Sequence, residues 1–160
     1  MDMLYPKLRD AEIWALGIPV YAPRPGEMQN LLNRTMPLFD GGIDVRDKHV
    51  YPGRRRDFKL GKIVLVSSCS FWDIVNFDKL AYVIEELSKV LDVDFVGAVL
   101  RPHADVLMGM TRKGADVAHV LDAAREAGRQ SIRNKRISGK ILEAVASPLV
   151  SRNQYLKRSS

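Results

Sequence analysis

The chain has 160 residues, of which 46% are hydrophobic and 28% charged, a composition typical of a single folded domain (1–160) and not of a disordered segment. No apolar run approaches the ~20 residues that a helix needs to cross a bilayer, and the first residues lack the layout of a signal peptide. We therefore expect no membrane partner and a cytoplasmic location. The single cysteine, Cys69, excludes an internal disulfide and an iron–sulfur cluster held by four cysteines of this chain.

The net charge of +6, from 25 basic and 19 acidic residues, raises the question of an anionic partner. The basic residues are dispersed, and the one tight run, Arg54–Arg56, has no interleaved aromatic side chains on which bases could stack. We expect a solvated basic surface and no nucleic-acid partner. Binding of a phosphate group by this run is the less favoured alternative.

A short helix and a buried strand open the chain. Apolar residues within 2–10 fit a helix that tolerates a proline in its first turn. Residues 12–17 contain an apolar run, which is typical of a strand buried on both faces of a parallel sheet. Pro19 is expected to end the strand because it has no N–H to donate, and the proline-rich residues 22–26 continue as a loop.

A helix, a long connection and a second strand follow. Apolar residues recur at helical spacing over 27–36. Residues 37–60 contain two Gly-Gly or Pro-Gly pairs and are expected to form a long irregular excursion over the active-site edge, with room for a short hairpin around 49–51. Residues 62–68 are apolar and rich in β-branched side chains, so they are the clearest strand of the sequence.

The second half continues the alternation of helix and strand. Asn76 is a good N-cap for a helix with one apolar face, and residues 94–100 read as a third strand. An amphipathic helix is predicted from 115 to about 136. Ser138 is expected to cap a last short helix, and the basic tail 150–160 is expected to fray.

This alternation predicts an α/β fold with a parallel sheet and helices on both faces. The loops that follow residues 12–17 and 62–68 would then lie at the carboxyl ends of their strands, where open α/β sheets bind ligands. The first loop begins at Pro19, and the second is rich in small and aromatic residues, Ser67-Ser68-Cys69-Ser70-Phe71-Trp72.

Both loops resemble those of the flavodoxin-like NAD(P)H-dependent FMN reductases, a group that includes the iron–sulfur flavoproteins. The first loop is similar to the family's flavin-contacting segment through Pro19-Val20-Tyr21, Met28 and Arg34, and departs from its common form at Ile18, Gln29 and Asn33. The second is similar to a Ser-Thr-Cys-Gly-Phe-Trp loop of one subgroup. That subgroup also shares Arg101-Pro102-His103 and a pattern matched by 124–130, so the similarity extends over nearly the whole chain.

The resemblance implies a three-layer flavodoxin-like sheet and an FMN-dependent NAD(P)H oxidoreductase or electron-transfer flavoprotein. It places the cofactor against Pro19, Val20, Tyr21, Ala22, Ser67, Ser68, Cys69, Ser70, Phe71 and Trp72. Hydride transfer is the flavin's own chemistry, so no catalytic acid is sought. Judged from the residues alone, the more frequent role of Tyr21, Phe71 and Trp72 would be ordinary packing beneath the loops.

Other candidate side chains have simpler interpretations. Cys69 as a nucleophile would need a histidine brought near it by the fold, whereas a small residue in a tight loop is the favoured interpretation. His103 could face a ligand, but a solvated turn residue is favoured.

The resemblance also implies a truncated fold with about three strands retained. In a flavodoxin-like sheet of order 2-1-3-4-5, residues 12–17 correspond to the third strand, and only eleven residues precede them here. The phosphate-binding loop would then be missing. Two hypotheses remain open: a flavin enzyme whose site is completed by another chain, and a degenerate flavodoxin-fold protein that serves as an oligomerisation or interaction module. Under both we expect a homo-oligomer that covers the exposed edge of strand 12–17.

Overall fold

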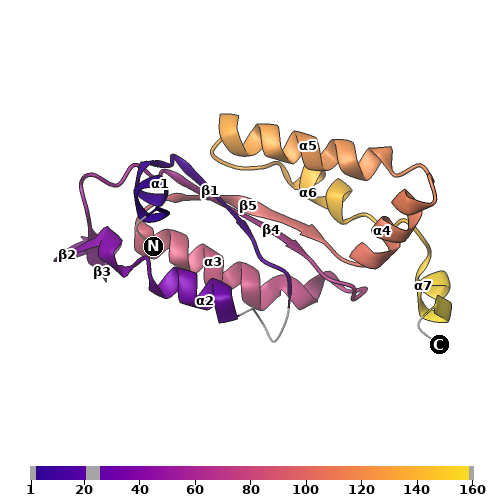
Figure 1. Ribbon diagram of the computed structural model, residues 1–160, viewed down its shortest axis with the longest axis horizontal. Helices are drawn as coiled ribbons and strands as arrows, with labels where there is room; N and C mark the ends of the chain where they lie inside the picture. The colour runs from indigo at the N-terminus through magenta and orange to yellow at the C-terminus, as the bar shows by residue number, and fades with distance from the viewer. Residues whose placement is uncertain (1–2, 21–25, 159–160) are drawn as a thin grey trace.

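The main sheet consists of three parallel strands in the order β1-β4-β5 (Figure 1). The computed structural model describes residues 3–20 and 26–158. The strands are β1 (Ile13–Gly17), β4 (Lys62–Ser68) and β5 (Asp94–Arg101), close to the predicted ranges. The central strand β4 pairs with β5 along its whole length and with β1 over Lys62–Val66.

Helices cover both faces of this sheet (Figure 1), which confirms the expected α/β arrangement. On one face lie α1 (Tyr5–Asp10), α2 (Gly26–Asn33) and α3 (Asp78–Leu91), and on the other α5 (Ala118–Arg133) and α6 (Gly139–Ala146). The remaining helices are α4 (Ala104–Arg112), which follows β5, α7 (Arg152–Arg158), and two 3-10 turns, Met36–Leu38 and Ile74–Phe77.

The larger part of the core lies between the sheet and α3. Side chains alternate along each strand, so every second residue of β1 and β4 faces α3. This cluster consists chiefly of Trp14, Leu16, Ile63, Leu65, Leu80, Ile84 and Leu91. Each such side chain contributes about 1.5–3 kcal/mol when fully buried. A smaller cluster on the other face joins Val64 and Val96 to α5 and α6.

Strand β1 is buried on one face only, which corrects the expectation of burial on both. Trp14 and Leu16 face α3 and are buried, whereas Ala15 and Gly17 face the other side and are exposed. Nor does Pro19 end the pairing: the N–H groups of Ile18 and Val20 still donate to β4, at 3.0 and 3.2 Å. Even-numbered residues of this strand point their N–H groups at β4, so the N–H that proline lacks would have pointed away.

Residues 37–60 are mostly a hairpin rather than an irregular excursion. Strands β2 (Phe39–Arg46) and β3 (His49–Arg54) pair antiparallel. Asp47 and Lys48 join them with positive φ angles of 47° and 67°, as a two-residue hairpin turn requires. The hairpin escaped prediction beyond residues 49–51 because its strands contain glycine and proline, which are depleted in strands.

Two arginines fasten this hairpin to the end of α3. Arg54 donates to the carbonyl oxygens of Leu91 and Asp92, at 3.3 and 3.0 Å, and to those of Phe58 and Leu60. Arg46 donates to the carbonyls of Lys89 and Val90 and pairs with Asp92. Carbonyls at the C-terminal end of a helix lack the N–H partners of the helix interior and attract cations; that of Lys89 also accepts the Asp92 N–H at 3.2 Å.

Arg54 is therefore not part of a solvated charge run, as the sequence suggested. Its guanidinium also lies 4.7 Å from the centre of the Phe58 ring. Leu60 precedes β4 and Asp92 precedes β5, so Arg54 lies at the amino ends of the strands. Arg54 and the candidate loops thus lie at opposite ends of the strands.

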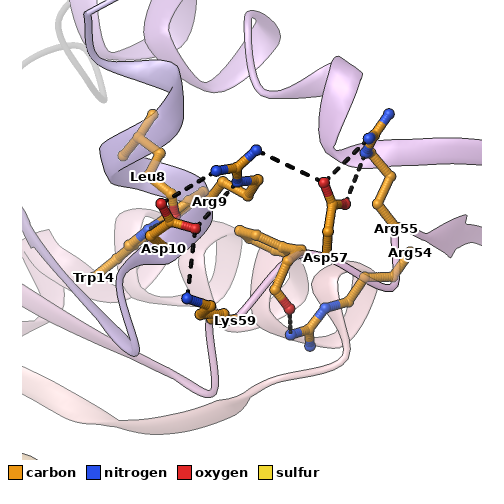
Figure 2. A network of polar contacts seen from close by, with 9 residues as sticks. Leu8, Arg9, Asp10, Trp14, Arg54, Arg55, Asp57 and Lys59 are labelled. Atoms are coloured by element: carbon orange, nitrogen blue, oxygen red, sulfur yellow. Dashed lines mark hydrogen bonds and ion pairs between the residues drawn. The ribbon is translucent and has the colours of Figure 1, made fainter.

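A network of charged side chains ties α1 to the segment before β4 (Figure 2). Arg9 lies between Asp10 and Asp57, at 3.1 and 3.8 Å, while Arg55 pairs with Asp57 and Lys59 with Asp10. These pairs are exposed, so solvent screens them and they contribute little to stability. The buried member of the same region is Trp14, whose Nε1 donates to the Leu8 carbonyl at 3.0 Å.

The helix predicted from 115 to about 136 is confirmed as α5, but one helix was missed and two predictions require correction. The missed helix is α4, which is short, contains Gly109 and has no side-chain cap, so its signal was weak. Asn76 is not an N-cap but lies inside a 3-10 turn, where its side chain donates to the Asp73 carbonyl. Within the tail, residues 152–158 form α7 instead of fraying.

We predict that Arg54→Gln lowers the free energy of unfolding by about 2–3 kcal/mol, because several buried carbonyls lose a charged donor. Arg56→Gln is the matched control: Arg56 belongs to the same run, is exposed, and should change stability by less than about 0.5 kcal/mol. Urea denaturation of the two variants measures the difference. Equal, small effects would show that Arg54 does not anchor the hairpin.

Candidate functional site

The carboxyl ends of β1 and β4 lie side by side. Backbone pairing carries on past β1, since Val20 N–H donates to the Ser68 carbonyl and the Ser67 hydroxyl donates to the Ile18 carbonyl at 2.5 Å. Pro19 is exposed beside this pair. Four of the predicted site residues are thus neighbours: Pro19, Val20, Ser67 and Ser68. Tyr21 and Ala22 lie outside the described residues.

The loop after β4 lies across the end of β5. Cys69 N–H donates to the Arg101 carbonyl, Ala104 N–H to the Cys69 carbonyl, and His103 N–H to the Phe71 carbonyl, at 2.8–3.1 Å. Among the described residues, the N–H groups of Ser70 and Phe71 have no acceptor. Phe71 is 60% exposed, and Ser70 is exposed as well. This loop therefore presents unpaired backbone donors, among them those of Ser70 and Phe71, and one aromatic face to solvent.

Cys69 is a packing residue, in line with the favoured interpretation. Its side chain is buried, and its Sγ lies 3.7 Å from the Phe71 carbonyl oxygen. Burial raises the pKa of the thiol above its ordinary value. Since the thiolate is the nucleophilic form, this environment does not activate Cys69.

Trp72 faces the β5 side of the loop. Its ring lies 4.8 Å from the His103 ring and 5.2 Å from the Tyr155 ring, centre to centre. The Tyr155 hydroxyl, on α7, donates to the Ser70 carbonyl at 2.6 Å. Trp72 also lines a cavity of about 670 Å³ together with Pro102 and residues of α6. Its ring contacts are therefore with His103 and Tyr155.

His103 is buried, not a solvated turn residue. Only 1% of its surface is exposed, and its backbone is left-handed with φ 41°. Its Nδ1 lies 3.1 Å from Nη2 of Arg101. A guanidinium can only donate, so Nδ1 accepts and the imidazole proton resides on Nε2. Burial, and secondly the charge of Arg101, lowers the pKa of His103 below its ordinary value.

Arg101 links the end of β5 to the end of α6. Its Nη1 donates to the carbonyls of Val145 and Ser147, both at 2.8 Å. The side chain is 6% exposed, and burial lowers its pKa. The sequence drew attention to Arg101 and His103 only through the resemblance. Their burial depends on where α6 and α7 pack, which no local pattern encodes.

Comparison of the chain with protein-family models, with curated proteins and with solved structures found no match. In residues 3–20 and 26–158, no helix combines the length and the apolar character needed to cross a membrane.

We predict that the protein loses stability as the pH falls below the ordinary histidine pKa of 6.5. The native state binds the His103 proton less readily than the unfolded state, so the stabilisation is present above that value and is lost below it, by at most about 1.4 kcal/mol per pH unit. Urea denaturation of the wild type and of His103→Gln between pH 5 and 8 measures the loss, which the variant should lack. His49→Gln, at an exposed position on β3, should retain it; a wild-type profile identical to that of His103→Gln would contradict the assignment.

Proposed function

We propose that the protein is a flavodoxin-like flavoprotein that binds FMN at the carboxyl ends of β1 and β4 and transfers electrons from NAD(P)H to an acceptor. The observation that carries this proposal is the side-by-side placement of the two strand ends, with unpaired donors at Ser70 and Phe71. The order β1-β4-β5 also agrees with the last three strands of a 2-1-3-4-5 sheet, in which flavin binds at such strand ends.

The described side chains fit the ring system of a flavin better than its phosphate. The N–H groups of Ser70 and Phe71 suit the carbonyl oxygens of the pyrimidine edge, and the Phe71 ring offers an exposed apolar face. Residues 18–20 and 67–72 contain no basic side chain. Arg54, the first alternative as a phosphate-binding residue, already donates to carbonyl oxygens at the amino ends of the strands. We therefore propose binding dominated by the ring.

In this proposal the chain positions the cofactor rather than donating protons. When bound, FMN supplies the hydride and electron transfer. Ser70 and Phe71 orient its polar edge, while the Tyr155 hydroxyl and the Arg101 and Cys69 backbones hold the loop in place. Since the thiol of Cys69 is buried, the loop brings no competing nucleophile to the ring.

A second candidate function, assembly without flavin, is favoured by the outer edge of β1. The backbone N–H groups of the even-numbered residues of β1 point at β4. Those of Ile13, Ala15 and Gly17 therefore point away from β4, at the outer edge of the sheet. In the part of the chain that the structure describes, no strand pairs with them. Such an edge recruits another strand, and a two-fold axis would join two β1 strands antiparallel. We propose a homodimer formed in this way.

We predict that riboflavin and FMN bind with affinities within about tenfold of each other, because the phosphate contributes few contacts. Phe71→Ala should weaken the binding of both flavins by about tenfold. Tyr82 is an exposed aromatic residue on α3, and Tyr82→Ala should change neither affinity. Quenching of flavin fluorescence measures the affinities. No saturable binding of either flavin would refute the flavin proposal, and FMN binding more than a hundredfold tighter would place a phosphate site elsewhere.

We predict that the wild-type chain has twice its monomer mass in solution and that Ala15→Pro is a monomer. Proline at this position removes an outward N–H but leaves the bonds to β4 intact. Ala15→Ser keeps the N–H and should remain a dimer. Light scattering at micromolar concentration measures the mass; a monomeric wild type would exclude edge pairing. Trp14 on the same strand is unsuitable for this test, because it is part of the core.

A further inference from the structure

A second cavity, of about 340 Å³, lies on the α5 face of the sheet. Its floor is formed by the ends of β1 and β4, and its walls by helices α4, α5 and α6. Almost every lining side chain is apolar, among them Val66, Leu107, Leu121 and Ala124, and the only charged one is Arg101. The volume lies at the small end of the range for ligand pockets.

The charge of Arg101 has no anionic partner among the described residues. Its hydrogen bonds go to two carbonyls and to a neutral imidazole, and its Nε is buried with no acceptor. The other anchoring arginines differ. Arg46 pairs with Asp92 at 2.8 Å, and the same carboxylate interacts favourably with Arg54.

An unpaired charge at this depth is unfavourable, and side chains of this kind are almost never fully buried unless paired. The two carbonyls at the C-terminal end of α6 offset part of the positive charge of Arg101, since this end of a helix carries roughly half a negative elementary charge. The His103 imidazole cannot compensate, because it is neutral when its Nδ1 accepts from Arg101. A net positive charge therefore remains in the wall of an apolar cavity.

We propose that this cavity binds a small organic monoanion, a carboxylate with an aliphatic body, whose charge compensates that of Arg101 while the body packs against Leu107, Leu121 and Ala124. A single guanidinium matches one carboxylate. A phosphate dianion would leave a negative charge unpaired among apolar side chains. The cavity shares Pro19, Ser67 and Ser68 with the strand ends at which FMN is proposed to bind. The proposal does not rest on flavin binding, because the charge comes from Arg101 on β5 and the apolar walls from the helices.

The direct test compares hexanoate with 1-hexanol, which has the same chain length without the charge. Both are titrated into the ¹⁵N-labelled protein at pH 7.5 without flavin, and amide and arginine Nε–H resonances are followed by NMR. We expect hexanoate to shift the Arg101 Nε–H and the amides of residues 120–124 in a saturable manner. Hexanol should bind at least about tenfold more weakly, because it lacks a charge-assisted interaction. Inorganic phosphate should cause no such shifts.

Two variants separate the charge from the cavity. Arg101→Gln should abolish the preference for hexanoate, while Arg125→Gln, at an exposed position of α5, should retain it. Ala124→Leu fills the cavity and leaves the arginine in place, so it serves even if Arg101→Gln fails to fold. It should weaken hexanoate at least tenfold, and Ala118→Leu, exposed on the same helix, should not. Equal affinities for hexanoate and hexanol, undiminished binding to Ala124→Leu, or no saturable shift with hexanoate would each overturn the proposal.

Discussion

The structure depends on the pairing of β4 with a parallel strand on each side. A parallel sheet buries both faces under helices, and a sheet of only three strands has to obtain this cover from few elements. α3 supplies it on one face, and α5 with α6 on the other. The cover is least complete over β1 and the end of β4, where Ala15, Gly17 and Val66 remain exposed. This incomplete cover and the free outer edge of β1 come from the same shortage of elements.

Arginines complete the hydrogen bonding that such a small sheet leaves unsatisfied. The end of α3 is held by Arg46 and Arg54, and the end of α6 by Arg101. Each guanidinium reaches carbonyls from a different part of the chain, so it joins elements that are distant in the sequence. Part of the positive net charge thus has a structural use.

The sequence predicted the elements whose local pattern agrees with their final environment. β4 is apolar and β-branched, and it is the central strand; the adjacency of the loops at Pro19 and Ser67 follows from parallel pairing. The hairpin was predicted only around residues 49–51, because Gly41 and Pro52 oppose strand formation locally and tertiary anchoring by Arg54 outweighs that preference. The burial of His103 depends on residues that follow it by more than forty positions, so no short stretch of the sequence contains the signal for this burial.

The anchoring of the hairpin has a kinetic consequence. β2 and β3 are adjacent in the chain, so they can pair within microseconds. The carbonyls to which Arg54 donates lie more than thirty positions away, and they are in place only once α3 has formed. The hairpin is therefore a cooperative unit that docks late and can undock without unfolding β4. Its amide protons should exchange with solvent through this opening, at a rate set by the guanidinium contacts and separate from that of the central strand.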